Sequence, residues 1–222
     1  MAEVTTTVPR FAAYLFDLDG TLVDTAPDIN AALNHSLTRF DLPPVAAALT
    51  RHWVGHGSRT LIGEALRHHG AAHVDIDQLL EPFLDYYEAH LANHSRIYPG
   101  VTDTLDVLRA QGARLAVVTN KSRRLTHPLL AQIGLAEYFE LVICGDTASA
   151  PKPDPAPVRY CLDHFGLGPE SAVIVGDSNT DVQAGRAAGI AVVCVRDGYN
   201  HGIDVTTLDV DAVIDHFDEL VT

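Results

Sequence analysis

Short apolar segments recur along the chain, and helical patterns separate the later ones. The apolar segments are residues 12–16, 114–118, 140–144, 172–175 and 190–195. Their runs of apolar and β-branched residues predict strands that are buried on both faces. Helical patterns cover residues 102–110, 124–133, 156–165 and 181–188, and a glycine, which commonly ends a helix, follows each of them closely. The alternation predicts an α/β fold with a doubly wound parallel sheet.

The first strand is separated from the second by a segment far longer than one crossover connection requires. Thr25, Pro27 and Asp28 are typical of the start of a helix. Periodic apolar positions then predict helical faces, which are Ile29, Leu33, Leu37 and Phe40; then Leu61, Ile62, Ala65 and Leu66; then Ile76, Leu80, Phe83, Leu84, Tyr87 and Leu91. We predict that residues 23–96 form an inserted all-helical cap on a core made of residues 1–22 and 97–222.

The composition is that of an ordinary globular protein. With 222 residues, 47% of them hydrophobic, the chain can bury a core and a small inserted module without disulfides. Cys144, Cys161 and Cys194 lie in apolar stretches without metal-ligand spacing, which predicts reduced core residues. Residues 1–10 lack a leader pattern, and the longest apolar run is too short to cross a membrane. We therefore expect a cytoplasmic protein, either a monomer or a homodimer.

The charge balance limits the possible partners. The chain has 15 Lys and Arg against 29 Asp and Glu, a formal net charge of -14. This field repels nucleic acid and anionic membrane surfaces, so we expect neither as a partner. It also repels a phosphorylated substrate. A phosphate site in this chain therefore needs a local cation, a lysine or a helix N-terminus.

Polar residues follow four of the predicted strands. They are Asp17-Leu18-Asp19-Gly20-Thr21, then Thr119-Asn120, then Gly145-Asp146 with a loop to Lys152, and finally Gly176-Asp177-Ser178 with Asp181 close behind. The carboxyl ends of parallel strands lie at one edge of a sheet, where ligands bind. Carboxylates gathered there repel one another unless a divalent cation lies among them. Because all these ligands are oxygens, Asp17, Asp19, Asp177 and Asp181 predict a Mg²⁺ site.

These motifs, in this order at strand ends, resemble those of the haloacid dehalogenase superfamily over essentially the whole chain. The resemblance implies a phosphatase in which Asp17 is the nucleophile and becomes transiently phosphorylated. It implies that Asp19 protonates the leaving alcohol and later activates water. Thr119 and Lys152 would hold the phosphoryl oxygens.

The same resemblance implies the ligands of the metal. Asp17, the main-chain carbonyl of Asp19, and Asp177 would bind Mg²⁺, and Asp181 would orient this set. Asp181 has a simpler alternative reading, because an acidic residue in the first turn of a helix is favoured by the helix dipole.

Three polar residues of these loops leave alternatives open. Thr119 and Asn120, taken alone, are also typical of an ordinary strand exit, although beside the other motifs we predict that Asn120 contacts the substrate. The chain has two lysines, Lys121 and Lys152, and both lie in the predicted active-site loops. Lys121 is equally compatible with a role in the site and with a solubilising surface position.

Segment 51–59 is the most distinctive part of the predicted cap, with Gly55 and Gly57 in a turn. It resembles the specificity loop of the phosphoglycolate phosphatase subfamily, as do segments 145–147, 152–155 and 198–202. The resemblance implies 2-phosphoglycolate as substrate, with Gly55, His56 and Arg59 as substrate-binding candidates. His56 or Arg59 would reach the carboxylate, for which an arginine fork is well suited. The alternative is a plain turn between helices.

Departures from that pattern at residues 150–151 and 196–197 leave a sugar phosphate or pyrophosphate open as substrate. A phosphonate hydrolase or a mutase would call for a cap lysine, and residues 23–96 contain none. Dehalogenases generally lack the second aspartate, whereas Asp19 is present. A binding module with a silent site is the non-enzymatic alternative. It is disfavoured because every catalytic position is filled.

Overall fold

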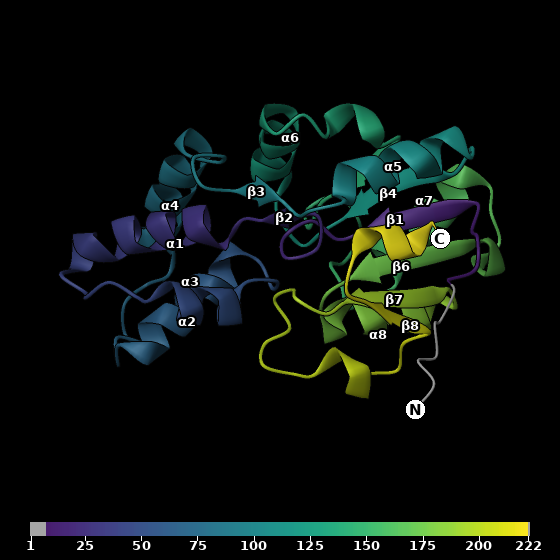
Figure 1. The fold of residues 1–222 in the computed structure, drawn as a ribbon. Helices are drawn as coiled ribbons and strands as arrows, with labels where there is room; N and C mark the ends of the chain where they lie inside the picture. Colours follow the sequence, from purple (N-terminus) through teal and green to yellow (C-terminus); the bar gives the residue numbers. More distant parts are fainter. Residues whose placement is uncertain (1–7, 222) are drawn as a thin grey trace.

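The computed structural model describes residues 8–221 and contains a six-stranded parallel sheet (Figure 1). Its strands are β1 (Ala13–Phe16), β4 (Arg114–Val118), β5 (Leu141–Ile143), β6 (Ala172–Gly176), β7 (Ala191–Val195) and β8 (Ala212–Ile214), in the order β5-β4-β1-β6-β7-β8. The chain builds outward from β1 to one edge and then to the other, so the predicted doubly wound sheet is confirmed. Residues 1–7, most of the segment inspected for a leader pattern, and residue 222 lie outside the described residues.

Helices cover both faces of this sheet. Alternate residues of β1 point to opposite sides, so Tyr14 and Phe16 join one buried cluster while Ala13 and Leu15 join another. The first cluster includes residues of α5 (Val101–Ala110) and α6 (Arg123–Gln132), and the second includes residues of α7 (Ala156–Phe165) and α8 (Asn179–Ala188). Burial on both faces explains why the strands are continuous apolar runs.

Four helices form a lobe beside the sheet, on the left in Figure 1. They are α1 (Ala26–Leu37), α2 (Ala47–Trp53), α3 (Ser58–His68) and α4 (Asp77–Ala89). Leu33, Ile62 and Phe83 are among the side chains that this lobe buries. Helix α2 was not predicted, because it has seven residues and a single buried one, Thr50, and therefore no apolar face. We call residues 26–89 the cap lobe.

Single turns of 3-10 helix and one edge strand complete the fold. The turns are η1 (Thr38–Phe40), η2 (Ala136–Tyr138), η3 (Pro169–Ser171), η4 (Val205–Thr207) and η5 (Phe217–Leu220). The edge strand β8 was not predicted, because Asp211 and Asp215 limit its apolar run to three residues. Cys144, Cys161 and Cys194 are buried and free, as predicted. Over the described residues, no helix is both long and apolar enough for a membrane span.

The cap lobe is connected to the sheet through a small antiparallel pair that the sequence did not reveal. Strand β2 (Val23–Asp24) pairs with β3 (Arg96–Ile97), so Val23 lies opposite Ile97 and Asp24 opposite Arg96. The pair places the outgoing and the returning chain side by side. The cap boundaries proposed from the sequence, residues 23 and 96, fall within it.

The start of α1 was predicted from Thr25 and Asp28, but these residues act differently from the capping pattern. The Thr25 hydroxyl donates to the Asp19 carboxylate at 2.6 Å and makes no cap to the helix. The buried Asp28 carboxylate instead accepts the backbone N–H groups of His94 and Ser95. Both side chains thus fasten the cap lobe to its connections.

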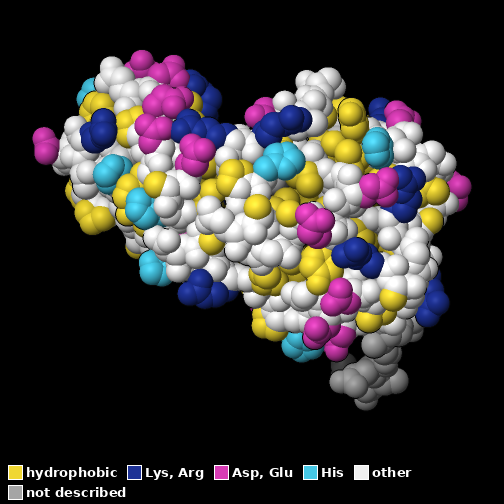
Figure 2. All heavy atoms as spheres, turned by 90° about the horizontal axis from the view of Figure 1, so that it is seen from above, with side chains coloured by type: hydrophobic (Ala, Val, Ile, Leu, Met, Phe, Trp, Pro, Cys, Tyr) yellow, Lys and Arg dark blue, Asp and Glu magenta, His cyan; other side chains and the backbone are white. Residues whose placement is uncertain are grey.

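Charged side chains alternate in sign on the face shown in Figure 2, where Lys and Arg lie among Asp and Glu. Arg124 of α6 takes part in a cluster of ion pairs. Its guanidinium pairs with Glu81, Asp85 and Glu88 of α4, at 3.1, 2.6 and 2.7 Å. We call this group the Arg124 clamp, because it joins the cap lobe to a helix of the core.

Candidate active site

Three neighbouring strands bring together residues that are far apart in the sequence. Because β4, β1 and β6 are adjacent, Thr119, Asp17 and Asp177 follow neighbouring strand ends. Carboxylate oxygens of Asp17, Asp177 and Asp181 lie within 4.8 Å of one another, and all three residues are buried. The predicted meeting of these three aspartates is therefore present in the structure.

Lys152 lies between two of these carboxylates. Its ammonium group is 2.9 Å from Asp17 Oδ1 and 2.6 Å from Asp181 Oδ1, and its side chain is 2% exposed. Asp181 uses its other oxygen to accept the Ser178 hydroxyl at 2.8 Å and the Ser178 N–H at 3.2 Å, at the start of α8. Since both Asp181 oxygens have protein donors, the geometry favours Asp181 as the residue that orients Lys152 over Asp181 as a direct metal ligand.

The Asp177 carboxylate is fixed by backbone and side-chain donors. It accepts the Thr21 hydroxyl at 3.1 Å and the backbone N–H of Tyr199. Gly20 and Gly198 pack against it so closely that a Cβ at either position would collide with the carboxylate. Gly20 also has a φ of +89°, which disfavours other residues. The two glycines therefore let the backbone approach Asp177.

Burial and mutual repulsion disfavour the charged forms of two of these carboxylates, Asp17 and Asp177. Burial, with added repulsion from Asp181 and Asp19, raises the pKa of Asp17 to about 6 against the opposing effect of Lys152. Burial and the charges of Asp17 and Asp181 raise the pKa of Asp177 well above its ordinary value. A cation among these oxygens would favour their charged forms. The donor set, all carboxylate oxygens, fits a hard divalent cation.

Asp19 turns its carboxylate away from this cluster. Lys121 Nζ lies 2.9 and 3.2 Å from its two oxygens, and the Thr25 hydroxyl holds the first of them. Lys121 also donates to the hydroxyl of Tyr87, a cap residue on α4, at 2.7 Å. Asp17 and Asp19, two residues apart, are thus held by different lysines in different surroundings.

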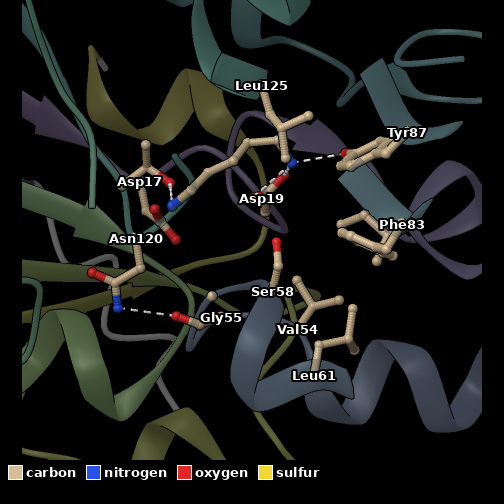
Figure 3. A pocket seen from close by; sticks show the side chains of 14 residues that line it. Asp17, Asp19, Val54, Gly55, Ser58, Leu61, Phe83, Tyr87, Asn120 and Leu125 are labelled. Carbon is tan, nitrogen blue, oxygen red and sulfur yellow. Dashed lines mark hydrogen bonds and ion pairs between the residues drawn. The ribbon is translucent and has the colours of Figure 1, made fainter. Parts of the chain in front are cut away.

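A cavity of about 40 Å³ lies between these residues and the cap lobe. Its core side is polar and includes Asp17, Asp19, Thr119, Asn120 and Lys121. Its cap side is largely apolar: Figure 3 shows Val54, Leu61 and Phe83 opposite the aspartates, with the Ser58 hydroxyl between them. The cavity thus has a polar wall at the strand ends and an apolar wall on the cap lobe.

Asn120 connects three segments around this cavity. Its side-chain amide donates to the carbonyl oxygen of Gly55 at 3.0 Å (Figure 3) and to that of Lys152 at 2.9 Å. The predicted turn at segment 51–59 therefore does face the strand ends, and Gly55 lines the cavity. Gly145 packs against the backbone of Asn120 with no room for a Cβ.

The structure does not bring the other two predicted cap residues to the cavity. Arg59 is 59% exposed and pairs with Asp77 inside the cap lobe. Successive helical residues differ by about 100° in direction, so Arg59 points outward when its neighbour Ser58 faces the cavity. His56 lies in an adjacent hollow, with its ring 4.8 Å from that of His201 and Nε2 3.3 Å from the Thr180 hydroxyl.

Comparisons with known proteins agree with this arrangement. Residues 14–195 match the model of the haloacid dehalogenase-like hydrolase family. The chain belongs to this family. Among curated relatives, the phosphoglycolate phosphatase of Nitrosococcus oceani is 43% identical over 209 residues, 93% of each chain. The phosphoglycolate phosphatase of Pseudomonas putida is 42% identical over 94% of this chain and 77% of its own.

Solved structures give the same family likeness. The crystal structure of a predicted phosphoglycolate phosphatase from Haemophilus somnus has a TM-score of 0.91 and 36% identity, covering 96% of this chain and 97% of its own. CbbY from Rhodobacter sphaeroides, solved in complex with phosphate, has a TM-score of 0.81 and 26% identity, covering 95% and 96%. The haloacid dehalogenase-like fold therefore extends over the core and the cap lobe together.

In this haloacid dehalogenase-like hydrolase, three polar residues that line the cavity were not assigned to the site from the sequence. Ser58 carries no sequence signal beyond its place after Gly57. Tyr87 was assigned to a buried helical face, which is correct for its ring, but its hydroxyl meets Lys121. Lys121 was left open, and the structure resolves it: the side chain is 4% exposed and paired with Asp19. The scarcity of lysines was the one available signal.

Proposed function

We propose that this hydrolase is a Mg²⁺-dependent phosphomonoesterase that converts 2-phosphoglycolate and water to glycolate and phosphate. The observation that carries the proposal is the meeting of Asp17, Asp177 and Lys152 beside a small cavity that also contains Asp19. Relatives about 40% identical over most of the chain are named phosphoglycolate phosphatases, which supports the choice of substrate.

The chemistry follows from the different surroundings of two aspartates. A carboxylate oxygen of Asp17 attacks phosphorus, and the bond from phosphorus to the leaving oxygen breaks while Asp19 donates a proton to that oxygen. Water then attacks the phosphorus of the aspartyl phosphate, and Asp19 takes up its proton. The bond to Asp17 breaks, and phosphate leaves.

The neighbouring groups hold the phosphoryl oxygens. Lys152 lies 2.9 Å from Asp17, so its ammonium group is placed to neutralise charge that develops on the transferred group. Asp181 fixes that ammonium from its other side. Thr119, buried at the end of β4, offers a hydroxyl on the same edge.

Asp17, Asp177 and the main-chain carbonyl of Asp19 would hold Mg²⁺. When bound there, the ion neutralises the clustered carboxylates and attracts phosphoryl oxygens in a protein whose overall charge is -14. Asp181 would orient these metal ligands through its contacts with Lys152 and with Ser178 at the start of α8.

The shape of the cavity favours a small substrate. Its volume is about 40 Å³, and its cap wall is largely apolar: Val54, Leu61 and Phe83 offer a polyol no hydrogen bonds, which leaves only the hydroxyls of Ser58 and Tyr87 on that side among the described lining residues. The hydroxyls of a sugar phosphate would lose their hydrogen bonds to water against this wall. Glycolate has a two-carbon frame and avoids most of this cost.

A panel of phosphate esters tests the proposal. We expect kcat/KM for 2-phosphoglycolate to exceed the values for pyrophosphate and sugar phosphates. Hydrolysis of an aryl phosphate should stop after chelation and in Asp17→Asn. Equal rates of aryl phosphate hydrolysis in the wild type with Mg²⁺, the wild type with chelator and Asp17→Asn would show that the protein is not this enzyme. If kcat/KM for 2-phosphoglycolate did not exceed the values for the other esters, the proposed substrate would be wrong, but the phosphatase activity would stand.

A further inference from the structure

Lys121 holds a position that the proposed chemistry does not yet use. Among the described residues that line the cavity, it is the one cationic side chain. Its ammonium group is buried and contacts both oxygens of Asp19 from the core and the Tyr87 hydroxyl from the cap lobe. A buried lysine costs free energy unless its charge is compensated. The position is therefore built around that charge.

The site of the leaving group can be located from Asp19. An oxygen that receives a proton from Asp19 must lie within hydrogen-bond distance, about 2.7 Å, of one of its carboxylate oxygens. Lys121 Nζ lies 2.9 and 3.2 Å from those same oxygens. The leaving group is therefore a direct neighbour of the Lys121 ammonium. In glycolate the carboxylate carbon is bonded to the carbon that carries the leaving oxygen, so the carboxylate falls within reach of that ammonium.

The other cations near the cavity are engaged elsewhere. Lys152 is held between Asp17 and Asp181, on the phosphoryl side. Arg51 pairs with Asp24 at 2.8 Å and lies over the ring of Tyr199. Arg59 pairs with Asp77 inside the cap lobe. Within residues 8–221, Lys121 is thus the cation placed to meet a charged leaving group.

We propose that Lys121 determines specificity by binding the carboxylate of the leaving group, so that the enzyme selects phosphomonoesters of short hydroxy acids. Before the substrate binds, the Lys121 ammonium group donates hydrogen bonds to the Asp19 carboxylate and the Tyr87 hydroxyl. The substrate carboxylate becomes a further partner of Nζ when the cavity is filled. This inference rests on the proposed phosphatase function. It assigns to Lys121 the contact with the substrate carboxylate that His56 or Arg59 was expected to provide.

The apolar cap wall strengthens the selection. A substrate carboxylate that entered without Lys121 would lie against Val54, Leu61 and Phe83 and lose hydration that no other cation lining the cavity in the described part of the chain replaces. A neutral leaving group loses much less hydration free energy against this wall and does not need a cation. Lys121 should therefore separate charged from neutral substrates of equal size, which a purely structural lysine would not do.

The test compares 2-phosphoglycolate with its amide, 2-phosphoglycolamide, which has nearly the same size and no carboxylate. In the wild type, kcat/KM for the acid should exceed that for the amide. In Lys121→Met, the value for the acid should fall about 10- to 100-fold further than the value for the amide, as expected for loss of a charged hydrogen bond. Any damage to Asp19 affects both esters and cancels in the ratio.

Two control variants separate recognition from architecture. Arg124→Met removes a cation that also joins the core to α4, but lies outside the cavity, and the acid-to-amide ratio should stay as in the wild type. Tyr87→Phe removes the cap partner of Lys121 and keeps the ammonium, so most of the preference for the acid should remain. Lys121→Gln, which retains hydrogen bonding but no charge, repeats the main test.

The outcomes are distinct. A wild type that prefers the amide, or treats both esters alike, overturns the inference without any variant. Retention of the full preference in Lys121→Met and Lys121→Gln also overturns it, even if phosphoglycolate remains the best substrate. The proposed function fails separately, if the wild type hydrolyses pyrophosphate or sugar phosphates faster than phosphoglycolate.

Discussion

At the scale of single residues, the site consists of charges that the fold buries in pairs. Asp17 and Lys152 form one ion pair and Asp19 and Lys121 form another, and both lysines are nearly inaccessible to solvent. Removing one partner from a buried pair costs far more than removing a surface pair, because it leaves a charge without compensation. This difference makes the roles of these residues testable by stability as well as by activity.

Asp17→Asn should abolish phosphate release and, in the presence of a chelator, change the pH dependence of stability. Burial raises the pKa of Asp17 from 3.8 to about 6, so the folded state binds the proton more tightly than the unfolded state. That contribution is fully present below about pH 4 and is lost as the pH rises through about 6. Relative to the wild type, the variant should therefore gain up to about 3 kcal/mol in unfolding free energy between pH 4 and about pH 7.

Denaturant unfolding of both proteins across this pH range, with chelator, measures the effect. A stability difference that is independent of pH would show that Asp17 ionises normally in the folded protein. Activity retained in the variant would remove Asp17 from the role of nucleophile.

Lys152→Met and Arg59→Met should differ sharply. The first leaves Asp17 and Asp181 without their shared cation, and we expect a loss of roughly 3–5 kcal/mol in unfolding free energy together with loss of activity. The second removes one partner of an exposed pair, so stability and kcat/KM should stay close to the wild type. Chemical denaturation and phosphate release measure both. A large loss of phosphoglycolate activity in Arg59→Met would restore Arg59 as a substrate contact.

At the scale of elements, the loops after the strands position the site through close backbone contacts. Gly198→Ala would push a methyl group into the Asp177 carboxylate. We expect a higher Mg²⁺ requirement for activity and a lower kcat, because one predicted ligand moves. Gly63→Ala is the matched control: it lies within α3, where an added Cβ meets its nearest neighbours at an ordinary 3.6 Å, so the metal requirement should not change. Activity is titrated with Mg²⁺ in the wild type, Gly198→Ala and Gly63→Ala. Equal Mg²⁺ concentrations at half-maximal activity in all three would contradict the expectation.

The core could be predicted at this scale because strong local signals coincide. Residues 114–118 and 156–165 were predicted with the bounds that the structure shows, since a continuous apolar run indicates a buried strand and a periodic pattern that ends at a glycine indicates a helix. The polar residues after the strands predicted the meeting of Asp17, Asp177 and Asp181 because parallel strand ends share an edge.

The cap contacts could not be predicted in the same way, because they depend on tertiary placement. Strands β2 and β3 have two residues each, too few for any pattern. Whether Ser58 or Arg59 faces the cavity depends on the rotation of α3, which one residue of register changes. The Tyr87 hydroxyl belongs to a residue whose ring is core, so its contact with Lys121 has no signature in the chain.

At the scale of the whole molecule, the cap lobe is attached to the core by polar contacts around the cavity as well as by packing. Asn120 reaches Gly55, Lys121 reaches Tyr87, and the Arg124 clamp joins α6 to α4. Since polar contacts exchange with water more readily than buried apolar ones, these are the contacts that a moving cap would break. These bonds therefore help to hold the cap wall opposite the aspartates.

The net charge of -14 and the three clustered carboxylates predict that divalent cations stabilise the whole protein. A ligand that binds the folded state alone stabilises it by about 2.7 kcal/mol at a concentration 100 times its Kd. For a chain of this size, that should raise Tm by roughly 5–10 °C.

Asp177→Asn should lose most of this rise in Tm. Asp146→Asn, which alters an exposed aspartate after β5 that accepts the N–H of Arg123, should keep it. Thermal scans with Mg²⁺ and with chelator distinguish the two. An equal rise in both variants would mean that Mg²⁺ screens the overall charge, and the acidic cluster would then not be the metal site.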